Sequence, residues 1–295
     1  MNKTKLYSIG FALLPRIPRN VRYVFAAVVG YIIWAISPAL RNKVRANLAH
    51  IPELAKHPQK LNTATRNAFT QLMLNYADLF APLDLNNPEL AKRFPILNKD
   101  VLDTALAAQK GVILVTFHHS AFEQAKYALR QLCDCPIVTP VEPFAPAEAF
   151  LLVNGERARS GIQFLPFNDP ETLRAMLKTL RIGGAVLLAI DRDIGGNGIE
   201  TELFNGKANI PAGVIHLART SGAPIVLMRG LRKNFFSYEG RIVSVTQSVA
   251  PQTKSPEAVR QALQPIIQCM EKEISLAPEQ WVAVFADHLF QVDSQ

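Results

Sequence analysis

The chain has 295 residues, of which 49% are hydrophobic and 19% are charged, a composition that excludes an intrinsically disordered protein. This length predicts one large domain, or one domain with an appended segment. The net charge is +8, and it is located at one end: eight of the 32 basic residues lie in residues 1–50, which contain no Asp or Glu, so residues 51–295 have 24 basic and 24 acidic residues. Because the basic excess alternates with apolar sequence, nucleic acid is not an expected partner.

The first predicted element is an apolar helix over residues 23–40, which contain no charge and are flanked by Arg22 and Arg41. Its length is at the lower limit for crossing a bilayer, and Pro38 shortens it further. We expect either a membrane span or a helix in the interface, attached to anionic lipid by the flanking basic residues; a core helix is the alternative. No convincing cleavage site follows, so a signal peptide is not expected. Residues 1–45 are predicted to form a basic, apolar membrane-anchoring segment.

Residues 41–100 show helical spacing of apolar side chains and are predicted to be amphipathic helices. The three cysteines of the chain are Cys133, Cys135 and Cys269. An odd number without a framework predicts free thiols in a reducing compartment, and no second Cys/His pair complements Cys133 and Cys135 as a metal site.

From about residue 101 the pattern alternates between short β-rich runs and helical segments. Strands are predicted near 112–117, 136–140, 162–165, 185–190, 224–229 and 241–246. Helices are predicted near 101–109, 120–132, 146–159, 169–181, 211–221 and 256–276. This order predicts an α/β domain over residues 46–295, with a mixed, mostly parallel central sheet flanked by helices and preceded by the membrane-associated helical segment.

The most informative local pattern is the pair of histidines that follows the uncharged run 111–117. His118 and His119 come at the end of this predicted strand, and Glu123 follows in the next helix. A histidine can accept a proton from a hydroxyl near neutral pH, and a carboxylate behind it would stabilise the imidazolium. Ser120 and Glu123 also fit a helix capping box, which would explain them without catalysis. The spacing does not decide whether His118 or His119 is the base.

Further polar side chains follow other predicted strands, where ligands of such sheets bind. Asp191 and Asp193 end the fourth strand; they could position a polar headgroup, begin a turn or, together with the histidines and Glu123, hold a metal ion. Pro211 opens a helix whose first free amides, near Gly213, could bind an oxyanion or phosphate.

Arg157 and Arg159 lie near the end of another predicted helix, where cations are favoured in any case, and they could instead bind an anionic substrate. The chain has no Gly-x-Ser-x-Gly sequence, so a serine hydrolase is not expected.

Taken in order, these motifs resemble a known family: the late acyltransferases of lipid A biosynthesis and the related bacterial glycolipid acyltransferases, within the lysophospholipid acyltransferase superfamily. The similar blocks are residues 44–54, 111–117 followed by His118-x4-Glu123, 156–160, 189–193, 203–206, 211–213, 217–219, 222–224 and 277–281. After Trp281 the chain reads Val-Ala-Val-Phe-Ala-Asp-His-Leu, where the lipid A enzymes usually have an aromatic and basic run.

The resemblance implies His118 as the catalytic base with Glu123 as its partner, and Arg157, Arg159, Asp191, Asp193, Pro211 and Gly213 as substrate-binding residues. It implies direct transfer of a fatty acyl chain from acyl carrier protein or acyl-coenzyme A, without metal or organic cofactor. The expected acceptor is a hydroxyl or amine of a lipid A precursor, with a lysophospholipid, an aminolipid or a mannosylated lipid as alternatives. The expected location is the cytoplasmic face of a bacterial inner membrane. A lipid-binding protein without turnover and a metal-dependent hydrolase are the competing functions.

Overall fold

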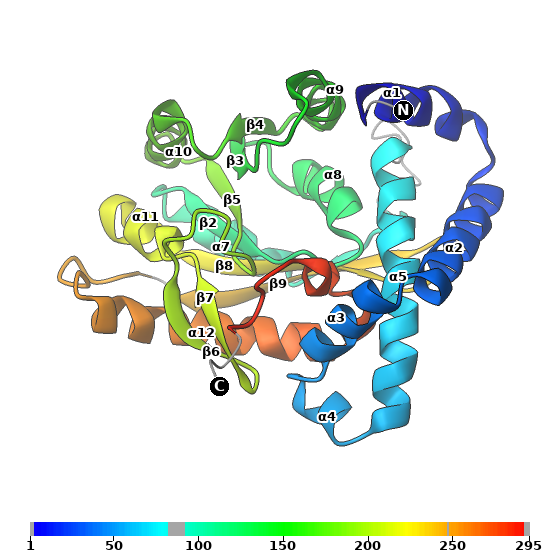
Figure 1. The fold of residues 1–295 in the computed structure, drawn as a ribbon. Helices are drawn as coiled ribbons and strands as arrows, with labels where there is room; N and C mark the ends of the chain where they lie inside the picture. The colour runs from blue at the N-terminus through cyan, green and yellow to red at the C-terminus, as the bar shows by residue number, and fades with distance from the viewer. Residues whose placement is uncertain (1–2, 82–91, 247, 292–295) are drawn as a thin grey trace.

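A computed structural model describes residues 3–81, 92–246 and 248–291 and contains a seven-stranded sheet in the order β1-β9-β8-β2-β5-β3-β4 (Figure 1). The strands are β1 (Ile96–Leu97), β2 (Val112–Thr116), β3 (Ile137–Val141), β4 (Gln163–Pro166), β5 (Ala185–Ala189), β8 (Ile225–Arg232) and β9 (Tyr238–Thr246). The β8–β9 pair is antiparallel and the other pairs are parallel, which confirms the predicted mixed, mostly parallel sheet. A separate hairpin of β6 (Ile199–Leu203) and β7 (Gly206–Ile210) was not predicted.

Helices cover both faces of this sheet. The helices of the described residues are α1 (Lys3–Leu13), α2 (Arg19–Ile36), α3 (Pro38–Leu48), α4 (Pro52–Ala55), α5 (Pro58–Phe80), α7 (Lys99–Ala107), α8 (Phe122–Leu132), α9 (Ala147–Ala158), α10 (Pro170–Arg181), α11 (Gly213–Ser221) and α12 (Pro256–Ser275). Of these, α1, α2 and α4 pack mainly on other helices beside the sheet. In β2, Ile113 and Val115 pack into the core with α10, α11 and α12, while Val112 and Leu114 pack with α7 and α8. A strand buried on both faces has no polar positions, which explains the uncharged run in the sequence.

The N-terminal apolar segment is divided into two helices at Pro38. Helix α2 ends at Ile36 and α3 begins at Pro38, since proline is tolerated at the first helical position but not in a helix interior. Among the described residues, α2 is the one helix that is long and apolar enough to cross a membrane, and 22% of it is buried. Its buried face, Arg22, Tyr23, Ala26 and Gly30, packs against α5.

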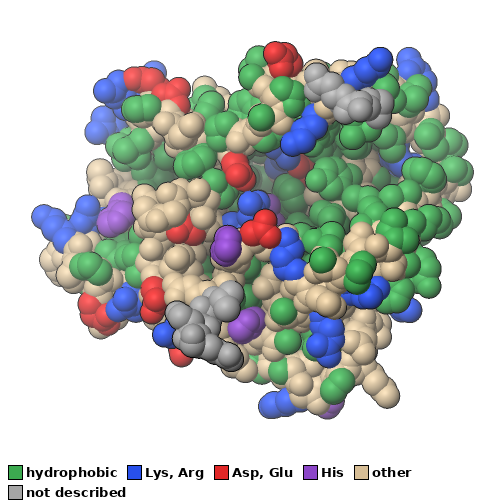
Figure 2. Space-filling view, in the orientation of Figure 1, with side chains coloured by type: hydrophobic (Ala, Val, Ile, Leu, Met, Phe, Trp, Pro, Cys, Tyr) green, Lys and Arg blue, Asp and Glu red, His purple; other side chains and the backbone are tan. Residues whose placement is uncertain are grey.

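The opposite side of α2 is an exposed apolar surface that continues onto α1. We call it the outward apolar face; its side chains are 39–72% exposed, and Figure 2 shows hydrophobic residues gathered over this edge of the molecule. Its members are Leu6, Ile9, Leu13, Val21, Val24, Phe25, Val28, Tyr31, Ile32 and Ile36. Because no described element covers this face, α2 is not the internal core helix that the sequence left open.

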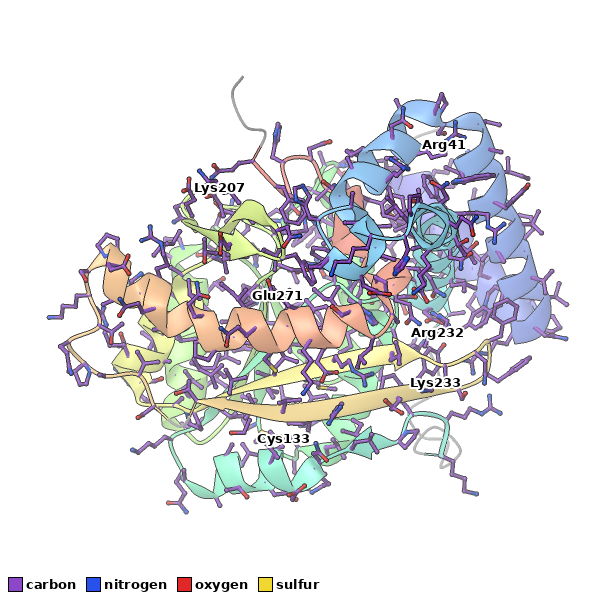
Figure 3. The ribbon with its side chains drawn as sticks, turned by 90° about the horizontal axis from the view of Figure 1, so that it is seen from below. Arg41, Cys133, Lys207, Arg232, Lys233 and Glu271 are labelled. Carbon is purple, nitrogen blue, oxygen red and sulfur yellow. A yellow bond between two sulfur atoms is a disulfide. The ribbon has the colours of Figure 1, made fainter. Side chains whose placement is uncertain are left out.

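A buried polar network joins α2 to the sheet. Asp78 of α5 is fully buried and accepts hydrogen bonds from Tyr23, from Tyr238 (3.1 Å) and from the Arg232 guanidinium (2.5 Å). Arg19 of α2 donates to the Tyr238 hydroxyl at 2.7 Å. Arg232 lies at the end of β8 (Figure 3), so the charge of Asp78 is balanced by a sheet residue. The network therefore fixes α2 to the rest of the protein through paired polar groups rather than through apolar contact alone.

The structure corrects the prediction that all three cysteines are free. Cys133 and Cys135 form a disulfide at the end of α8, where their Cα atoms are 5.2 Å apart, while Cys269 in α12 is free. The expectation of a reducing compartment, which rested on free thiols, therefore loses its support from these two residues.

The close contact of α2 with α5 generates a stability prediction. A Cβ atom added at Gly30 would lie 2.6 Å from the carbonyl oxygen of Phe69 and 2.8 Å from the Cα of Thr70. Because both atoms belong to the α5 backbone, Gly30→Ala should force the helices apart and lower the free energy of unfolding by about 1–3 kcal/mol. The control Gly155→Ala, in α9 with nothing within 4 Å of the added Cβ, should instead raise it by up to about 1 kcal/mol. Denaturant unfolding of both variants measures this; equal effects would contradict the close packing.

Candidate active site

A cavity of about 1370 Å³ opens at the carboxyl ends of the central strands. It is lined by the ends of β2, β3 and β5 (Thr116, Val141 and Ala189), by α5 and by the first turn of α11. This is the edge at which open α/β sheets bind ligands. The volume exceeds the roughly 300–1,000 Å³ typical of small-molecule sites, so the cavity has room for more than one substrate.

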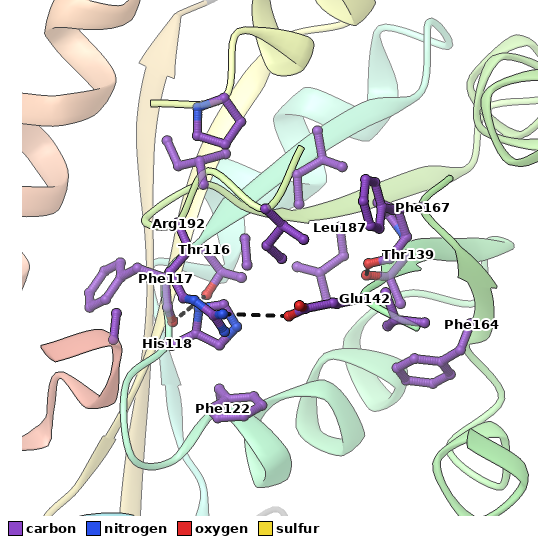
Figure 4. A pocket seen from close by; sticks show the side chains of 18 of the residues that line it. Thr116, Phe117, His118, Phe122, Thr139, Glu142, Phe164, Phe167, Leu187 and Arg192 are labelled. Carbon is purple, nitrogen blue, oxygen red and sulfur yellow. Dashed lines mark hydrogen bonds and ion pairs between the residues drawn. The ribbon is translucent and has the colours of Figure 1, made fainter. Parts of the chain in front are cut away.

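The cavity also has an apolar part, on the face of the sheet that α8 covers; Figure 4 shows two of its residues, Phe164 and Leu187. We call it the apolar arm; its lining residues are Ala125 and Leu129 of α8, Phe164, Leu187 and Met228. Met176 and Leu177 of α10 line the cavity too, but they pack with the core on the opposite face of the sheet. A groove with such walls removes an aliphatic chain from water and has few groups to bind a polar ligand.

His118 lies on the loop after β2 and is held by Asp191, which follows β5. The two strands are neighbours with Thr116 opposite Ala189, so the residues two positions beyond each strand face one another. Asp191 Oδ2 accepts the backbone N–H of His118 at 2.8 Å, and Asp191 Oδ1 lies 2.7 Å from His118 Nδ1. This pairing was not predicted, because the order of strands in a sheet cannot be derived from their order in the chain.

The protonation of this pair follows from the environment of Asp191. Burial alone would raise the pKa of its carboxyl, but the charge of His118 and hydrogen bonds from His118 and from the Trp281 indole N–H (2.9 Å) outweigh burial and lower the pKa. An ionised carboxylate can only accept, so Nδ1 of His118 is the donor and Nε2 is left as the basic nitrogen. Nε2 has no hydrogen-bond partner within the described residues, and His118 lines the cavity.

His119, the alternative base, is buried away from the cavity. Its side chain is fully buried, and its ring nitrogens lie 2.9 Å from the Gly230 carbonyl oxygen and 3.2 Å from that of Ala277. Burial lowers its pKa to about 4. His119 is not among the residues that line the cavity. It therefore has no route to a substrate proton, and its polar atoms connect β8 to the C-terminal segment.

Glu123 is not hydrogen-bonded to His118, which corrects the predicted pairing. Its oxygens bind the ammonium of Lys126 and the guanidinium of Arg157 (2.5 Å). Burial raises the pKa of Glu123, but Arg157 and Lys126 outweigh it and lower the pKa to about 2. Burial lowers the pKa of Lys126 to about 8. The three groups line the cavity with two cations and one anion, a cluster suited to binding an anion.

Lys126 was not identified in the sequence. The available signal was its position three residues after Glu123 on one helix face, a spacing at which a carboxylate and an ammonium meet.

The other predicted site residues divide into two groups. Asp193, Pro211 and Gly213 line the same cavity as His118, whereas Arg159 does not and has a side chain that is 75% exposed and paired with Glu156. Asp193 Oδ2 accepts the backbone N–H of Gly198 at 2.8 Å, and its buried Oδ1 has no partner within the described residues. In the described ranges, no group of three or more His, Cys, Asp or Glu side chains converges as a metal site.

The buried cluster around Glu123 generates the second stability prediction. Glu123→Gln leaves two cations beside a neutral amide, so we expect the free energy of unfolding to fall by about 3–5 kcal/mol. The control Glu156→Gln, made at an exposed pair with Arg159, should change it by less than about 1 kcal/mol. Equal losses in the two variants would contradict the role of burial.

The pH dependence of the same variant has a defined sign. Since the pKa of Glu123 is lowered from 4.5 to about 2, its contribution is complete above pH 4.5 and is lost as the pH falls through 2. The difference in stability between the native protein and Glu123→Gln should therefore shrink over this range. Urea unfolding at several pH values measures it, and a constant difference would argue against the lowered pKa.

Comparison with known proteins bears on the family of the chain and on the kind of reaction. A model of the bacterial lipid A biosynthesis acyltransferase family matches residues 3–286. The chain is 25% identical over 225 residues to a phosphatidylinositol mannoside acyltransferase of Mycobacterium tuberculosis, covering 75% of this chain and 70% of that one. It is 23% identical over 223 residues to a protein of the same name from Mycolicibacterium smegmatis, covering 74% and 71% of the two chains.

Proposed function

Because the chain belongs to the bacterial lipid A biosynthesis acyltransferase family, and is thus an acyltransferase, we propose that it transfers a fatty acyl chain from a thioester to a glycolipid at a membrane surface. The observation that carries the proposal is the geometry of His118. This histidine is oriented by a buried carboxylate, its Nε2 has no hydrogen bond among the described residues, and it lines a cavity that also contains an apolar arm. This combination suits the deprotonation of a hydroxyl or amine next to a bound acyl chain.

In the proposed reaction, His118 Nε2 accepts the proton of the acceptor hydroxyl or amine as its oxygen or nitrogen attacks the thioester carbonyl carbon. The tetrahedral intermediate collapses by breaking the carbon–sulfur bond, and the thiolate leaves with the proton from the imidazolium. Asp191, rather than Glu123, keeps the proton on Nδ1 and stabilises the imidazolium. The transfer is direct, without an acyl-enzyme, and needs neither metal nor cofactor.

Other residues that line the cavity take binding roles in this proposal. Arg157 and Lys126, held by Glu123, bind an anionic group of a substrate. The N-terminus of α11 at Gly213 has open space beside its Cα and stabilises the oxyanion through free backbone amides. Asp193 offers its unpaired Oδ1 to a hydroxyl of the acceptor.

The proposed acceptor is a glycolipid, because the family is described by lipid A and the relatives by phosphatidylinositol mannoside. A lipid A precursor is the first candidate, and lipid extracts from cells with and without the protein, compared by mass spectrometry, test it. Acyl carrier protein and coenzyme A are the two candidate donors. Supplying each with the same acyl chain to the purified protein distinguishes them.

We further propose that the outward apolar face lies in the interface of a bacterial inner membrane, on its cytoplasmic side. One face of α2 is buried on α5, so the opposite face is the one available to lipid, which fits a helix lying in the plane of the membrane better than a span. The basic residues of the N-terminal segment, such as Arg16 and Lys5, then face anionic headgroups.

Replacement of the proposed base tests the function directly. His118→Ala should lower the rate of acyl transfer by about 10²–10⁴-fold, the usual contribution of a general base. The control His57→Ala, at an exposed histidine before α5, should leave the rate unchanged. Thioester consumption in the presence of acceptor vesicles measures both. Near-native turnover of His118→Ala would overturn the assignment, and lipid binding without any thioester consumption by the native protein would indicate a lipid-binding protein instead.

Membrane binding is tested on the exposed side of α2. In the double variant Phe25→Asp/Val28→Asp, two charges replace side chains that are 65% and 50% exposed, so the fold should persist while sedimentation with phosphatidylglycerol vesicles falls on the order of tenfold. The control Ile182→Asp places a charge at a side chain that is 61% exposed at the end of α10 and should sediment like the native protein. Equal binding of the double variant would contradict the proposed orientation.

A further inference from the structure

The Asp191 carboxylate receives hydrogen bonds from two segments that are far apart in the chain. His118 contributes its backbone N–H and Nδ1, and the Trp281 indole contributes Nε1–H, which donates to Oδ2 at 2.9 Å. Asp191 itself is 1% exposed and Trp281 is fully buried. Trp281 is not among the residues that line the cavity, so its indole N–H does not contact a substrate directly.

The backbone on either side of Trp281 is paired with the loop that carries His118. The Val282 N–H donates to the His118 carbonyl at 2.8 Å, and the Ser120 N–H donates to the Gln280 carbonyl at 2.7 Å. The Gln280 side chain makes two hydrogen bonds of 2.8 Å to the backbone N–H and carbonyl of Arg232 in β8. The C-terminal segment 280–282 is thus fixed to β8 on one side and to the His118 loop on the other.

From this geometry we propose that Trp281 is a positioning residue for acyl transfer: its indole N–H holds the Asp191 carboxylate in the rotation that aligns it with His118 Nδ1. The inference rests on the proposed function of His118. The terminal torsion of an aspartate is broad, so a carboxylate bonded from one side can turn away from its partner. Both donors of His118 belong to one residue; the Trp281 N–H adds a donor to Oδ2 from a different segment, which restricts this rotation and keeps Oδ1 on the imidazole.

The packing around Trp281 fits this role. Its ring packs against Phe204 (centroids 5.9 Å apart) and Phe290 (6.4 Å). These two contacts fix the indole while its N–H donates to Asp191. A tryptophan that served packing alone would not need its N–H to hydrogen-bond a buried carboxylate. Here the Trp281 N–H donates a hydrogen bond to the Asp191 carboxylate and also orients it.

The test replaces the indole N–H while keeping an aromatic ring. Trp281→Phe should lower kcat for acyl transfer by about 10- to 100-fold with KM changed less than about twofold, because a small misplacement of a catalytic group acts on the chemical step. The control Phe290→Leu removes packing from the same indole without touching Asp191. Substitution of Trp281 by 3-benzothienylalanine, in which sulfur replaces the N–H in a ring of the same shape, covers the case in which Trp281→Phe does not fold.

A second readout needs no turnover. In the native protein, the proton of His118 Nδ1 shared with Asp191 should give a downfield proton resonance, which should be lost or broadened in Trp281→Phe and in the benzothienyl protein but kept in Phe290→Leu. An intact resonance together with kcat within twofold of the control would overturn the inference. If His118→Ala remains active, the proposed function fails, and the resonance still decides whether Trp281 positions Asp191.

Discussion

The arrangement of the site depends on one buried carboxylate that must be completely hydrogen-bonded. Asp191 has no access to water, so the charge of its carboxylate is acceptable only where donors surround it. The donors come from the loop after β2 and from the C-terminal segment, and in satisfying Asp191 they are themselves fixed. Burial of one charge thus aligns three segments that are 73 and 90 positions apart in the chain.

A second buried carboxylate plays the corresponding part at the N-terminal side. Asp78 in α5 joins Tyr23 of α2 to Arg232 and Tyr238 of the sheet. Arg232 also approaches the hydroxyl of Ser120 at 3.4 Å, beside His118. The network that joins α2 to the sheet therefore reaches the loop that carries His118 through Arg232. Replacing such groups by apolar ones need not destabilise the protein, but removing one partner leaves an unpaired buried charge.

Much of this fold could be predicted from the sequence, because the pattern of residues reflects burial. The central strands are apolar on both faces and were recognised, and their ends lie within a few residues of the predicted positions except in β8 and β9, which extend further. The hairpin β6–β7 was missed although Ile199, Thr201 and Leu203 show the alternation of a half-buried strand. The disulfide was missed because two cysteines separated by one residue fit free thiols equally well.

Most of the residues that the sequence singled out line the cavity, but their contacts with one another were not predicted. Polar residues at strand ends marked His118, Asp191 and Asp193, but which of them meet depends on β2 lying beside β5, a property of the sheet order that no local pattern encodes. The sequence proximity of Glu123 to His118 suggested a pair, whereas the first turn of α8 directs Glu123 toward Lys126 and Arg157. Spacing along a chain predicts contacts within a helix well and contacts between strands poorly.

Helix α1 contributes side chains both to the outward apolar face and to the cavity. Its Leu6 and Leu13 belong to the outward apolar face, while Tyr7 between them lines the cavity. If this face rests in a leaflet as proposed, the cavity wall and the hydrocarbon are separated by the thickness of one helix. An amphiphile could then move sideways out of the bilayer with its tail continuously shielded, and the enzyme would select among lipids that are already in the leaflet rather than among molecules dissolved in water.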